Sequence, residues 1–254
     1  MRLFAASDLH VDFKENRLLL GQLSDVDYKS DALIVAGDIA DRLELIKETL
    51  SLLRSKFRSV FFTPGNHELW VRTDDCNSIE KLHRILAVCD QLGVHTRPAR
   101  IGDTWIVPLF SWYDSAFSGE AETNQEELAA WADFHFCKWP AGLGEVSRFF
   151  LSMNEANIKP YDARVISFSH FLPRRELLPR LKYLRFKSLP KVVGCTGLDE
   201  QIRALGSSLH VFGHSHIRYD KVIDGIRYVQ YSLRYPRERI FSSFPIKMIA
   251  KTSA

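Results

Sequence analysis

The sequence has few cysteines, and no two of them have the close spacing of a metal-binding or redox motif. Four of its 254 residues are Cys, they lie far apart, and no C-x-x-C motif is present. This spacing excludes a disulfide framework or a cysteine-rich zinc cluster as the basis of the fold. We therefore expect reduced structural thiols at Cys76, Cys89, Cys137 and Cys195.

Long hydrophobic runs are also absent. The longest uncharged apolar stretch, Thr104 to Tyr113, is far shorter than the about 20 residues that a helix needs to cross a bilayer. The N-terminus shows no basic region followed by an apolar segment and a cleavage site. These two observations predict a cytoplasmic protein without a membrane anchor.

Neither sign of charge dominates the chain. Thirty-four Lys and Arg residues face 31 Asp and Glu residues, so the formal net charge is +3. This excess lacks the basic footprint typical of nucleic-acid-binding proteins, and nucleic acid is not indicated as a partner. No repeat, low-complexity tract or Pro/Gly/Ser linker interrupts the sequence. We predict a single domain over residues 1–254.

Short apolar runs alternate with amphipathic helical patterns. The runs typical of buried strands are 3–6, 33–36, 60–63, 104–109, 165–168 and 209–212. Gly102-Asp103 and Asp224-Gly225 predict hairpin turns. Helices are predicted at 43–57, 79–89, 145–158 and 199–205. For the second of these, Asn77 with Glu80 forms a capping pair and Gly93 a stop signal. This order predicts an α/β protein with at least one mixed sheet.

Residues of metal-ligand type follow five of these strands directly. The segments are Ser7-Asp8-Leu9-His10, Gly37-Asp38, Pro64-Gly65-Asn66-His67-Glu68, Ser169-His170 and Gly213-His214-Ser215-His216. In α/β sheets the loops beyond the carboxyl ends of strands converge and bind ligands. A single Asp or His in such a place is more often a turn or core residue. Five coincidences favour one shared site.

The spacing and chemistry of these residues suit a pair of metal ions. Residues two apart in an extended segment point the same way, as in the Asp-x-His and His-x-His pairs. Glycines precede Asp38, Asn66 and His214, where they allow sharp turns and close approach. Carboxylate, imidazole and amide ligands without thiolate favour Mn, Fe, Zn or Ni. Seven candidates exceed the need of one tetrahedral ion, whereas two ions about 3.5–4 Å apart use them all.

The ordered set D-x-H, G-D, G-N-H-E, H and G-H-x-H, which runs from Asp8 to His216, resembles that of the calcineurin-like metallophosphoesterases. The resemblance implies a four-layer α/β/β/α sandwich with two mixed β-sheets and a dinuclear metal centre. It implies that Asp8, His10 and His216 hold the first metal, that Asp38 bridges, and that Asn66, His170 and His214 hold the second. His67 is then a hydrogen-bond donor or general acid beside the metals. Glu68 supports a loop or orients His67.

The mechanism follows as a hypothesis. A hydroxide held between two ions attacks phosphorus in line, because the ions lower the pKa of bound water to about 7. Asp38 and His67 are the candidate catalytic residues, and His67 stabilises or protonates the departing oxygen. Asn66, His67 and Arg42 are candidate substrate-binding residues. The Arg42 segment resembles the Ser/Thr protein phosphatase motif, but Leu43 replaces the Gly expected there. A solvated Arg on the following helix is the alternative.

Two charged segments lie near these motifs. Residues 171–191 form a basic, flap-like insert, and residues 114–134 carry six acids and no base. Whether the insert covers the site or is a solvated loop stays open, as does pairing of the two segments within one chain or across a dimer. Four aromatic residues are interpreted as packing residues: Trp112, Tyr113, Trp131 and Trp139. The histidines left outside the site are His83, His95, His135 and His210. The arginines in 231–239 either reach the mouth of the substrate site or pin the C-terminus, and we expect the second.

The sequence therefore predicts a phosphodiesterase or phosphatase that acts on nucleotides or other small phosphoesters, with a slight preference for diesters. The Gly-His-Ser-His ending is closer to the smaller prokaryotic-type enzymes than to Ser/Thr phosphatases. One alternative is a Ser/Thr protein phosphatase-like monoesterase. Another is a catalytically inactive scaffold on the same fold, but the intact set of seven ligands and His67 favours an enzyme. The oligomeric state stays open.

Overall fold

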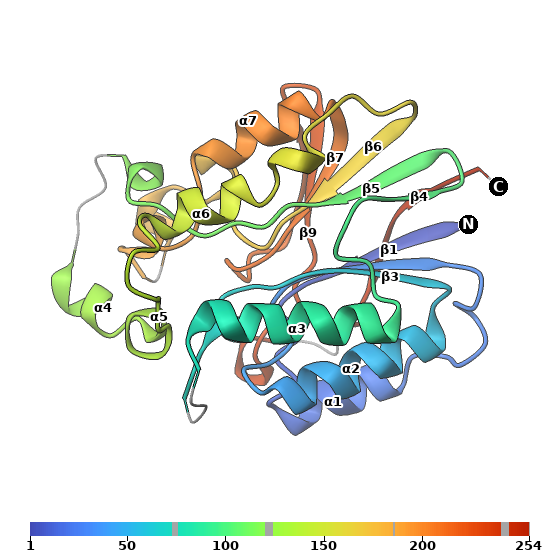
Figure 1. Ribbon diagram of the computed structural model, residues 1–254, viewed down its shortest axis with the longest axis horizontal. Coiled ribbons are helices and arrows are strands. Elements are labelled where there is room, and N and C mark those ends of the chain that lie inside the picture. Colours follow the sequence, from blue (N-terminus) through green and yellow to red (C-terminus); the bar gives the residue numbers. More distant parts are fainter. Residues whose placement is uncertain (73–75, 120–123, 185, 240–243, 254) are drawn as a thin grey trace.

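The computed structural model describes residues 1–72, 76–119, 124–184, 186–239 and 244–253, and it has two β-sheets between layers of helices. Helices α1, α2 and α3 lie on one side of the sheets, and α6 and α7 lie on the other (Figure 1). Buried apolar side chains fill the space between α1–α3 and the first sheet, between the sheets, and between the second sheet and α7. The predicted four-layer α/β/β/α sandwich with two mixed sheets is confirmed.

The first sheet has the strand order β10-β1-β2-β3. Its strands are β1 (Arg2–Ala6), β2 (Ala32–Ala36), β3 (Ser59–Thr63) and β10 (Lys247–Lys251). The first three are parallel, and β10 pairs antiparallel with β1. The crossover helices are α1 (Lys14–Gly21) and α2 (Leu43–Lys56), and α3 (Ser78–Leu92) follows β3. Both faces of this sheet are covered, which is why its parallel strands are continuous apolar runs.

The second sheet has the order β4-β5-β6-β7-β9-β8. Its strands are β4 (Ala99–Ile101), β5 (Thr104–Pro108), β6 (Arg164–Phe168), β7 (Ser207–Phe212), β8 (Tyr219–Ile223) and β9 (Ile226–Gln230). The central pairs are parallel, and the pairs β4–β5 and β8–β9 are antiparallel. Both predicted hairpins are confirmed. Asp224 and Gly225 have φ angles of 47° and 83°, as the tight turn requires.

Most predicted helices are confirmed, and the boundaries of α3 follow the expected signals. The Asn77 side chain accepts hydrogen bonds from the N–H groups of Ile79 and Glu80, and Glu80 accepts one from the Asn77 N–H. Gly93 ends the helix with a φ of 64°. Helix α7 (Gly197–Ala204) also lies where it was predicted.

The helix predicted over 145–158 was too long. Helix α6 covers only Val146–Ser152, and a 3₁₀ turn at Glu155–Asn157 follows it. The reason is Asn154, whose side chain accepts a hydrogen bond from the Phe110 N–H and donates one to the Phe110 carbonyl, both at 2.8 Å. These bonds tie the Asn154 side chain to another segment, and its backbone N–H donates to the Leu151 carbonyl in the 3₁₀ pattern instead of continuing the α-helix.

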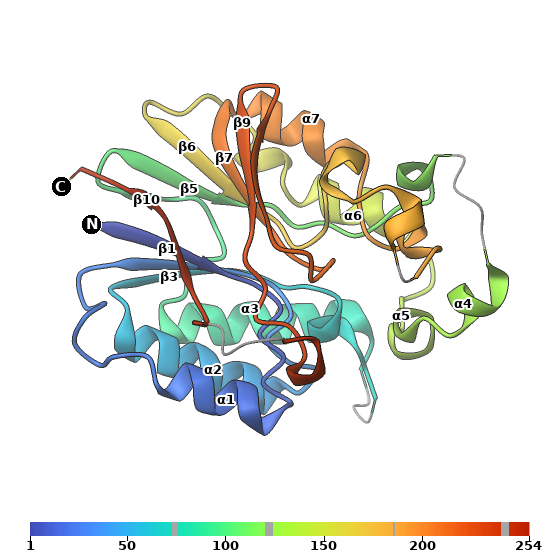
Figure 2. The same ribbon diagram turned by 180° about the vertical axis from the view of Figure 1, so that it is seen from behind.

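Several elements had no sequence signal strong enough to predict them, namely α1, α4 (Gln125–Ala129), α5 (Ala132–Phe136) and β10. Figure 2 shows β10 beside β1, so that the two ends of the described chain lie close together. Helices α4 and α5 project from the sandwich on the side of α6. Among the helices of the described residues, none is both long and apolar enough to cross a membrane.

A buried histidine on β7 makes stability depend on pH. His210 is fully buried, and its two ring nitrogens lie 2.8 Å and 3.0 Å from the hydroxyl groups of Ser167 and Ser169. Burial lowers the pKa of His210 from 6.5 to about 3. Below pH 6.5 the unfolded chain therefore binds a proton at His210 that the folded chain does not. The neutral, buried ring thus contributes its full stabilisation above pH 6.5, and the free energy of unfolding decreases as the pH falls toward 3.

We expect His210 to reduce the free energy of unfolding by about 2 kcal/mol between pH 6.5 and about pH 5. In urea titrations at both pH values, His210→Gln should be less stable at the higher pH but should lose less stability on acidification than the parent protein. His83→Gln, at an exposed helical position, should retain the parent pH dependence. Equal acid sensitivity of His210→Gln and the parent protein would contradict this assignment.

Candidate metal centre

The seven predicted ligands all follow the carboxyl ends of strands, and most of them have an unusual backbone conformation. Five have positive φ angles: Asp8 (51°), His10 (42°), Asp38 (58°), His214 (69°) and His216 (57°). Such angles cost of order 1–3 kcal/mol each in non-glycine residues and cluster at functional sites. The expectation of an extended segment for the Asp-x-His and His-x-His pairs was therefore wrong. Their side chains converge through left-handed backbone.

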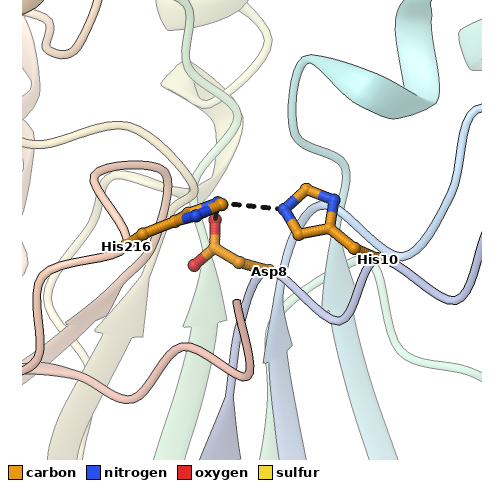
Figure 3. Close-up of side chains that lie close together, drawn as sticks. All are labelled: Asp8, His10 and His216. Carbon is orange, nitrogen blue, oxygen red and sulfur yellow. Dashed lines mark hydrogen bonds and ion pairs between the residues drawn. The ribbon is translucent and has the colours of Figure 1, made fainter. Parts of the chain in front are cut away.

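The first cluster consists of Asp8, His10 and His216. Ligand atoms from these three residues lie within 4.8 Å of one another, and Figure 3 shows the Asp8 carboxyl group and the two rings directed toward the same space. Nε2 of His216 lies 2.9 Å from Nε2 of His10 and 3.5 Å from Oδ1 of Asp8. Nδ1 of His216 lies 2.7 Å from a carboxylate oxygen of Glu238, which assigns its proton to Nδ1. The lone pair of His216 Nε2 thus faces the cluster.

The second cluster consists of Asn66, His170 and His214, with Asp38 beside it. Nδ1 of His170 lies 2.9 Å from the Ala36 carbonyl, and Nε2 of His214 lies 3.0 Å from the Val192 carbonyl. These partners assign a proton to each of those nitrogens. In the neutral rings, the opposite nitrogens are therefore unprotonated, yet they lie 3.1 Å apart.

Asn66 completes this arrangement of lone pairs. Its Oδ1 lies 2.9 Å from Nδ1 of His214 and 3.1 Å from Nε2 of His170. Its amide nitrogen donates a hydrogen bond to Asp133 at 2.8 Å, which fixes the oxygen toward the cluster. With both rings neutral, three acceptor atoms converge here without a hydrogen donor among them, an arrangement that a cation satisfies. The residues present therefore fit the metals that the resemblance implies.

Asp38 lies between the two clusters. Its Oδ2 is 3.4 Å from Nε2 of His170 and 3.8 Å from Nε2 of His67. Its Oδ1 accepts a hydrogen bond from the backbone N–H of His67 at 3.1 Å. His67 packs against the Trp70 ring, with 3.7 Å between centroids, and against His10. The structure thus brings Asp38 and His67 together with both clusters.

The electrostatics of the site favour the ligand forms of His10, His214 and Asp38, but not that of His170. Burial first, and then neighbouring histidines, lower the pKa values of His10 and His214, which keeps the rings neutral. Burial opposes the charge on Asp38, but His170 and His67 outweigh it and hold the pKa of Asp38 well below its usual value. Conversely, Asp38 outweighs burial at His170 and raises the pKa of that ring to about 9. Asp38 and the rings of His10 and His214 are thus already in the forms that bind metal, whereas His170 must release one proton before it can act as a ligand.

Glu68 supports the loops that carry Asp38 and Asn66. Its fully buried carboxylate accepts hydrogen bonds from the backbone N–H groups of Asp38 (2.9 Å), Ile39 (2.5 Å) and Gly65 (2.6 Å). Burial and the nearby charge of Asp38 raise the pKa of Glu68 to about 7. Gly65 itself has no room for a side chain, because a Cβ atom there would lie 2.3 Å from Oδ1 of Asp38.

Four residues near the site were missed or interpreted differently from the sequence. Glu238 and Tyr235 lie in and before a 3₁₀ turn at Pro236–Glu238. Asp133 and Trp131 come from the α4–α5 region, where Trp131 had been interpreted as a packing residue. Trp131 instead lines the cavity over the candidate ligands, and its indole N–H donates to Asp133. These segments lack strong periodicity, so the only available signal was their density of aromatic residues.

We expect Asp133 to control metal affinity at the second cluster. Asp133→Leu frees the Asn66 amide to rotate and should weaken binding of one metal equivalent about 10- to 100-fold, the usual effect of losing a ligand-orienting partner. Titration of the metal-free protein with Mn²⁺ by calorimetry measures this affinity. The control Trp131→Phe removes only the bond to Oδ2 of Asp133 and keeps the bond from Asn66 to Oδ1. Unchanged affinity in Asp133→Leu would contradict the prediction.

Two cavities open onto the site. The aromatic cavity, of about 260 Å³, lies over Asp38, Asn66, His67 and the 214–216 segment. The rest of its wall consists of Trp70, Trp131, Ala132, Leu189, Tyr235 and Glu238. The charged cavity, of about 360 Å³, lies over His10 and His67. The rest of its wall consists of Asp12, Phe13, Asp41, Trp70, Arg72, Tyr235 and Arg237.

Arg42 lines neither of these cavities. It lines a neighbouring hollow with Glu44, Lys81 and Arg84. Its role in substrate binding stays a prediction.

The charged segments meet within one chain. The Trp131 and Phe186 rings stack with centroids 5.3 Å apart, and Glu127 accepts a hydrogen bond from the Ser188 N–H. Arg174 forms ion pairs with Glu176 and Asp224. Arg185, Glu120 and Glu122 lie outside the described residues. Arg239 donates a hydrogen bond to Asn16, as expected of a pinned C-terminus, whereas Arg237 lines the charged cavity.

Comparisons with known proteins agree with this geometry. The calcineurin-like phosphoesterase family profile matches residues 1–218. The [acyl-carrier-protein] phosphodiesterase PptH of Mycobacterium tuberculosis is 30% identical over 261 residues, which cover 93% of this chain and 78% of PptH. The crystal structure of phosphopantetheinyl hydrolase (PptH) from the same organism matches with a TM-score of 0.80 and 28% identity, covering 98% of this chain and 95% of that chain.

Proposed function

The chain belongs to the calcineurin-like phosphoesterase family and is a metal-dependent phosphoester hydrolase, and we propose that it is a phosphodiesterase that removes a phosphopantetheinyl group from a carrier protein. The observation that carries this proposal is the convergence of acceptor atoms from five strand ends around Asp38, beneath a cavity with an aromatic wall. The similarity to PptH supports the choice of substrate.

We assign Asp8, His10 and His216 to one metal ion and Asn66, His170 and His214 to the other, with Asp38 shared by both. The lone-pair geometry of each cluster supports this assignment. The donor set of carboxylate, imidazole and amide groups favours Mn, Fe, Zn or Ni, with manganese and iron as the first candidates. Metal analysis of the purified protein tests the stoichiometry of two.

When bound, the two ions activate water for attack on phosphorus and neutralise charge on the phosphoryl oxygens. The protein then has to position the ester and protonate the departing oxygen. His67 borders both cavities, with 9% of its surface exposed, and can therefore reach an ester oxygen bound between them. The backbone N–H of His67 donates a hydrogen bond to Asp38, which anchors the residue, and contact with the tilted Trp70 ring holds the imidazole in place. We assign the role of general acid to His67.

The proposed substrate has a phosphodiester between a serine hydroxyl and an extended arm of two amides that ends in a thiol. Hydrolysis breaks one P–O bond, adds water, and gives two products when the serine oxygen leaves: phosphopantetheine and the carrier protein with a free serine. We assign residues 1–254 to a single domain that includes the basic segment 171–191. This segment contributes Leu189 to the wall of the aromatic cavity, which we assign to this substrate.

The direct test is incubation of the holoenzyme with a phosphopantetheinylated carrier protein, followed by mass spectrometry of the carrier. We expect loss of the phosphopantetheinyl group with Mn²⁺, and no loss with a chelator. A parallel panel contains cyclic and linear nucleotide diesters, p-nitrophenyl phosphate and a phosphoserine peptide. Turnover of monoesters alone would overturn the diesterase proposal, and turnover of nucleotide diesters without the carrier would replace the substrate with a nucleotide. Metal binding without any turnover would favour the scaffold alternative.

A further inference from the structure

Part of the site comes from a segment beyond the family profile. The profile match ends at residue 218, yet residues 235–238 enter both cavities. Glu238 accepts hydrogen bonds from the Tyr235 N–H (3.2 Å) and from His216 (2.7 Å), which fixes the segment against the first cluster. This segment therefore adds side chains to the site that the family profile does not cover.

Tyr235 forms a partition between the two cavities. Its ring lies against His10 and His216, with centroid distances of 4.3 Å and 4.9 Å. Its hydroxyl oxygen is 3.3 Å from Nε2 of His67. Tyr235 lines both cavities, and only His67 and Trp70 share this property among the residues that line them. A phosphate group at His67 therefore lies where the two cavities meet.

The walls of the two cavities differ in chemistry. Beyond the metal ligands, the aromatic cavity is closed by Trp131, Ala132 and Leu189, and its one further charged group, Glu238, is hydrogen-bonded to His216. Trp131 is held on both sides, by stacking on Phe186 and by its hydrogen bond to Asp133. This wall is preorganised and suits an extended, uncharged group.

The charged cavity contains side chains of both signs. Arg72 is paired with Asp41 at 2.6 Å, and Asp12 lies on the same wall. Arg237 is exposed and stands 5.7 Å from the centre of the Tyr235 ring. Such a wall offers hydrogen bonds and ion pairs to a peptide surface, but it is a poor environment for an apolar arm.

We propose that Tyr235 separates the two substituents of the phosphodiester, with the uncharged pantetheine-like arm in the aromatic cavity and the serine-bearing peptide in the charged cavity. This inference rests on the proposed phosphodiesterase function. A phosphodiester has two groups that diverge from phosphorus, and two unlike cavities that meet at His67 match two unlike groups. A monoester has only one such group and leaves one cavity without an occupant.

The arm assignment is tested with Leu189→Glu, which places a carboxylate in the aromatic cavity at a half-buried position. The probes are p-nitrophenyl phosphopantetheine and methyl p-nitrophenyl phosphate, which lacks the arm. We expect KM for the first probe to rise about 10-fold more than KM for the second, because a buried carboxylate disfavours an uncharged arm. Calorimetry with the product phosphopantetheine should show a parallel loss of affinity. Leu18→Glu, on the exposed face of α1, is the matched control.

The peptide assignment is tested with Arg237→Ala. KM should rise for the phosphopantetheinylated carrier protein, whereas the affinity for phosphopantetheine should stay at the parent value. For the partition itself, Tyr235→Ala should lower the ratio of diester to monoester kcat/KM, and Tyr235→Phe should retain it because the ring remains.

Three results would overturn the inference. These are equal KM changes for both probes in Leu189→Glu, a loss of phosphopantetheine affinity in Arg237→Ala, or a parent-like diester preference in Tyr235→Ala. Failure of the proposed function looks different, because the parent enzyme then leaves the carrier protein intact. The two synthetic diesters and the calorimetry still test the cavities in that case.

Discussion

Asp38→Asn is expected to lower kcat on any phosphodiester by about 10³-fold or more, since it removes the carboxylate shared by both clusters and with it several kcal/mol of stabilisation of the reacting centre. The substitution is isosteric, and the amide oxygen can still accept the hydrogen bond from the His67 N–H. The fold should therefore persist while bound metal falls below two equivalents. Inductively coupled plasma mass spectrometry measures the metal content, and turnover of bis(p-nitrophenyl) phosphate measures kcat.

The matched control is Asp90→Asn, at an exposed position on α3. It should keep both metal equivalents and the parent kcat. A fully metallated and fully active Asp38→Asn protein would contradict the assignment of Asp38 as the shared ligand. A protein that loses activity but keeps two tightly bound ions would limit the role of Asp38 to catalysis.

His67→Gln is expected to lower kcat by about 10²- to 10⁴-fold on a substrate with an alkoxide leaving group, the usual contribution of a general acid. Metal content should not change, because we assign His67 to the ester and not to an ion. The leaving group provides the specific test. Serine is a poor leaving group and needs protonation, whereas p-nitrophenolate leaves without it. The loss should therefore be much smaller for p-nitrophenyl diesters than for the carrier protein.

His83→Gln on the surface of α3 serves as the control for the His67 experiment. An equal loss on both classes of leaving group would argue against proton donation by His67. Loss of one metal equivalent in His67→Gln would make His67 a ligand, which its nearness to His10 and Asp38 would explain.

The strand ends were predictable because their signals are local. Each parallel strand is a short apolar run, and the residue types that follow it are few and chemically distinctive. The rule that loops beyond parallel strands of one sheet converge then brings Asp8, Asp38 and Asn66 together, whereas the place of His170, at the end of a strand of the second sheet, followed only from the family resemblance. The capping pair at Asn77 and the hairpin turn at Asp224-Gly225 were predictable for the same reason, since each depends on neighbouring residues alone.

The remainder of the site depends on contacts between distant segments. Asp133 holds the Asn66 amide across 67 positions, and Glu238 holds His216 across 22. Asn154 interrupts a helix through a partner 44 positions away. No local pattern marks a carboxylate or amide for such a role, because its partner is set by how the chain folds back.

The sequence by itself determined the class of chemistry: seven residues of metal-ligand type at the ends of buried strands, with His67 beside them. Only the tertiary structure decided which nitrogen of each histidine faces the clusters, which residues orient the ligands, and how Tyr235 divides the space above them. The physical reason is that strand formation and ligand chemistry follow from nearby residues, whereas tautomers, ligand orientation and cavity walls follow from hydrogen bonds and packing between segments far apart in the chain.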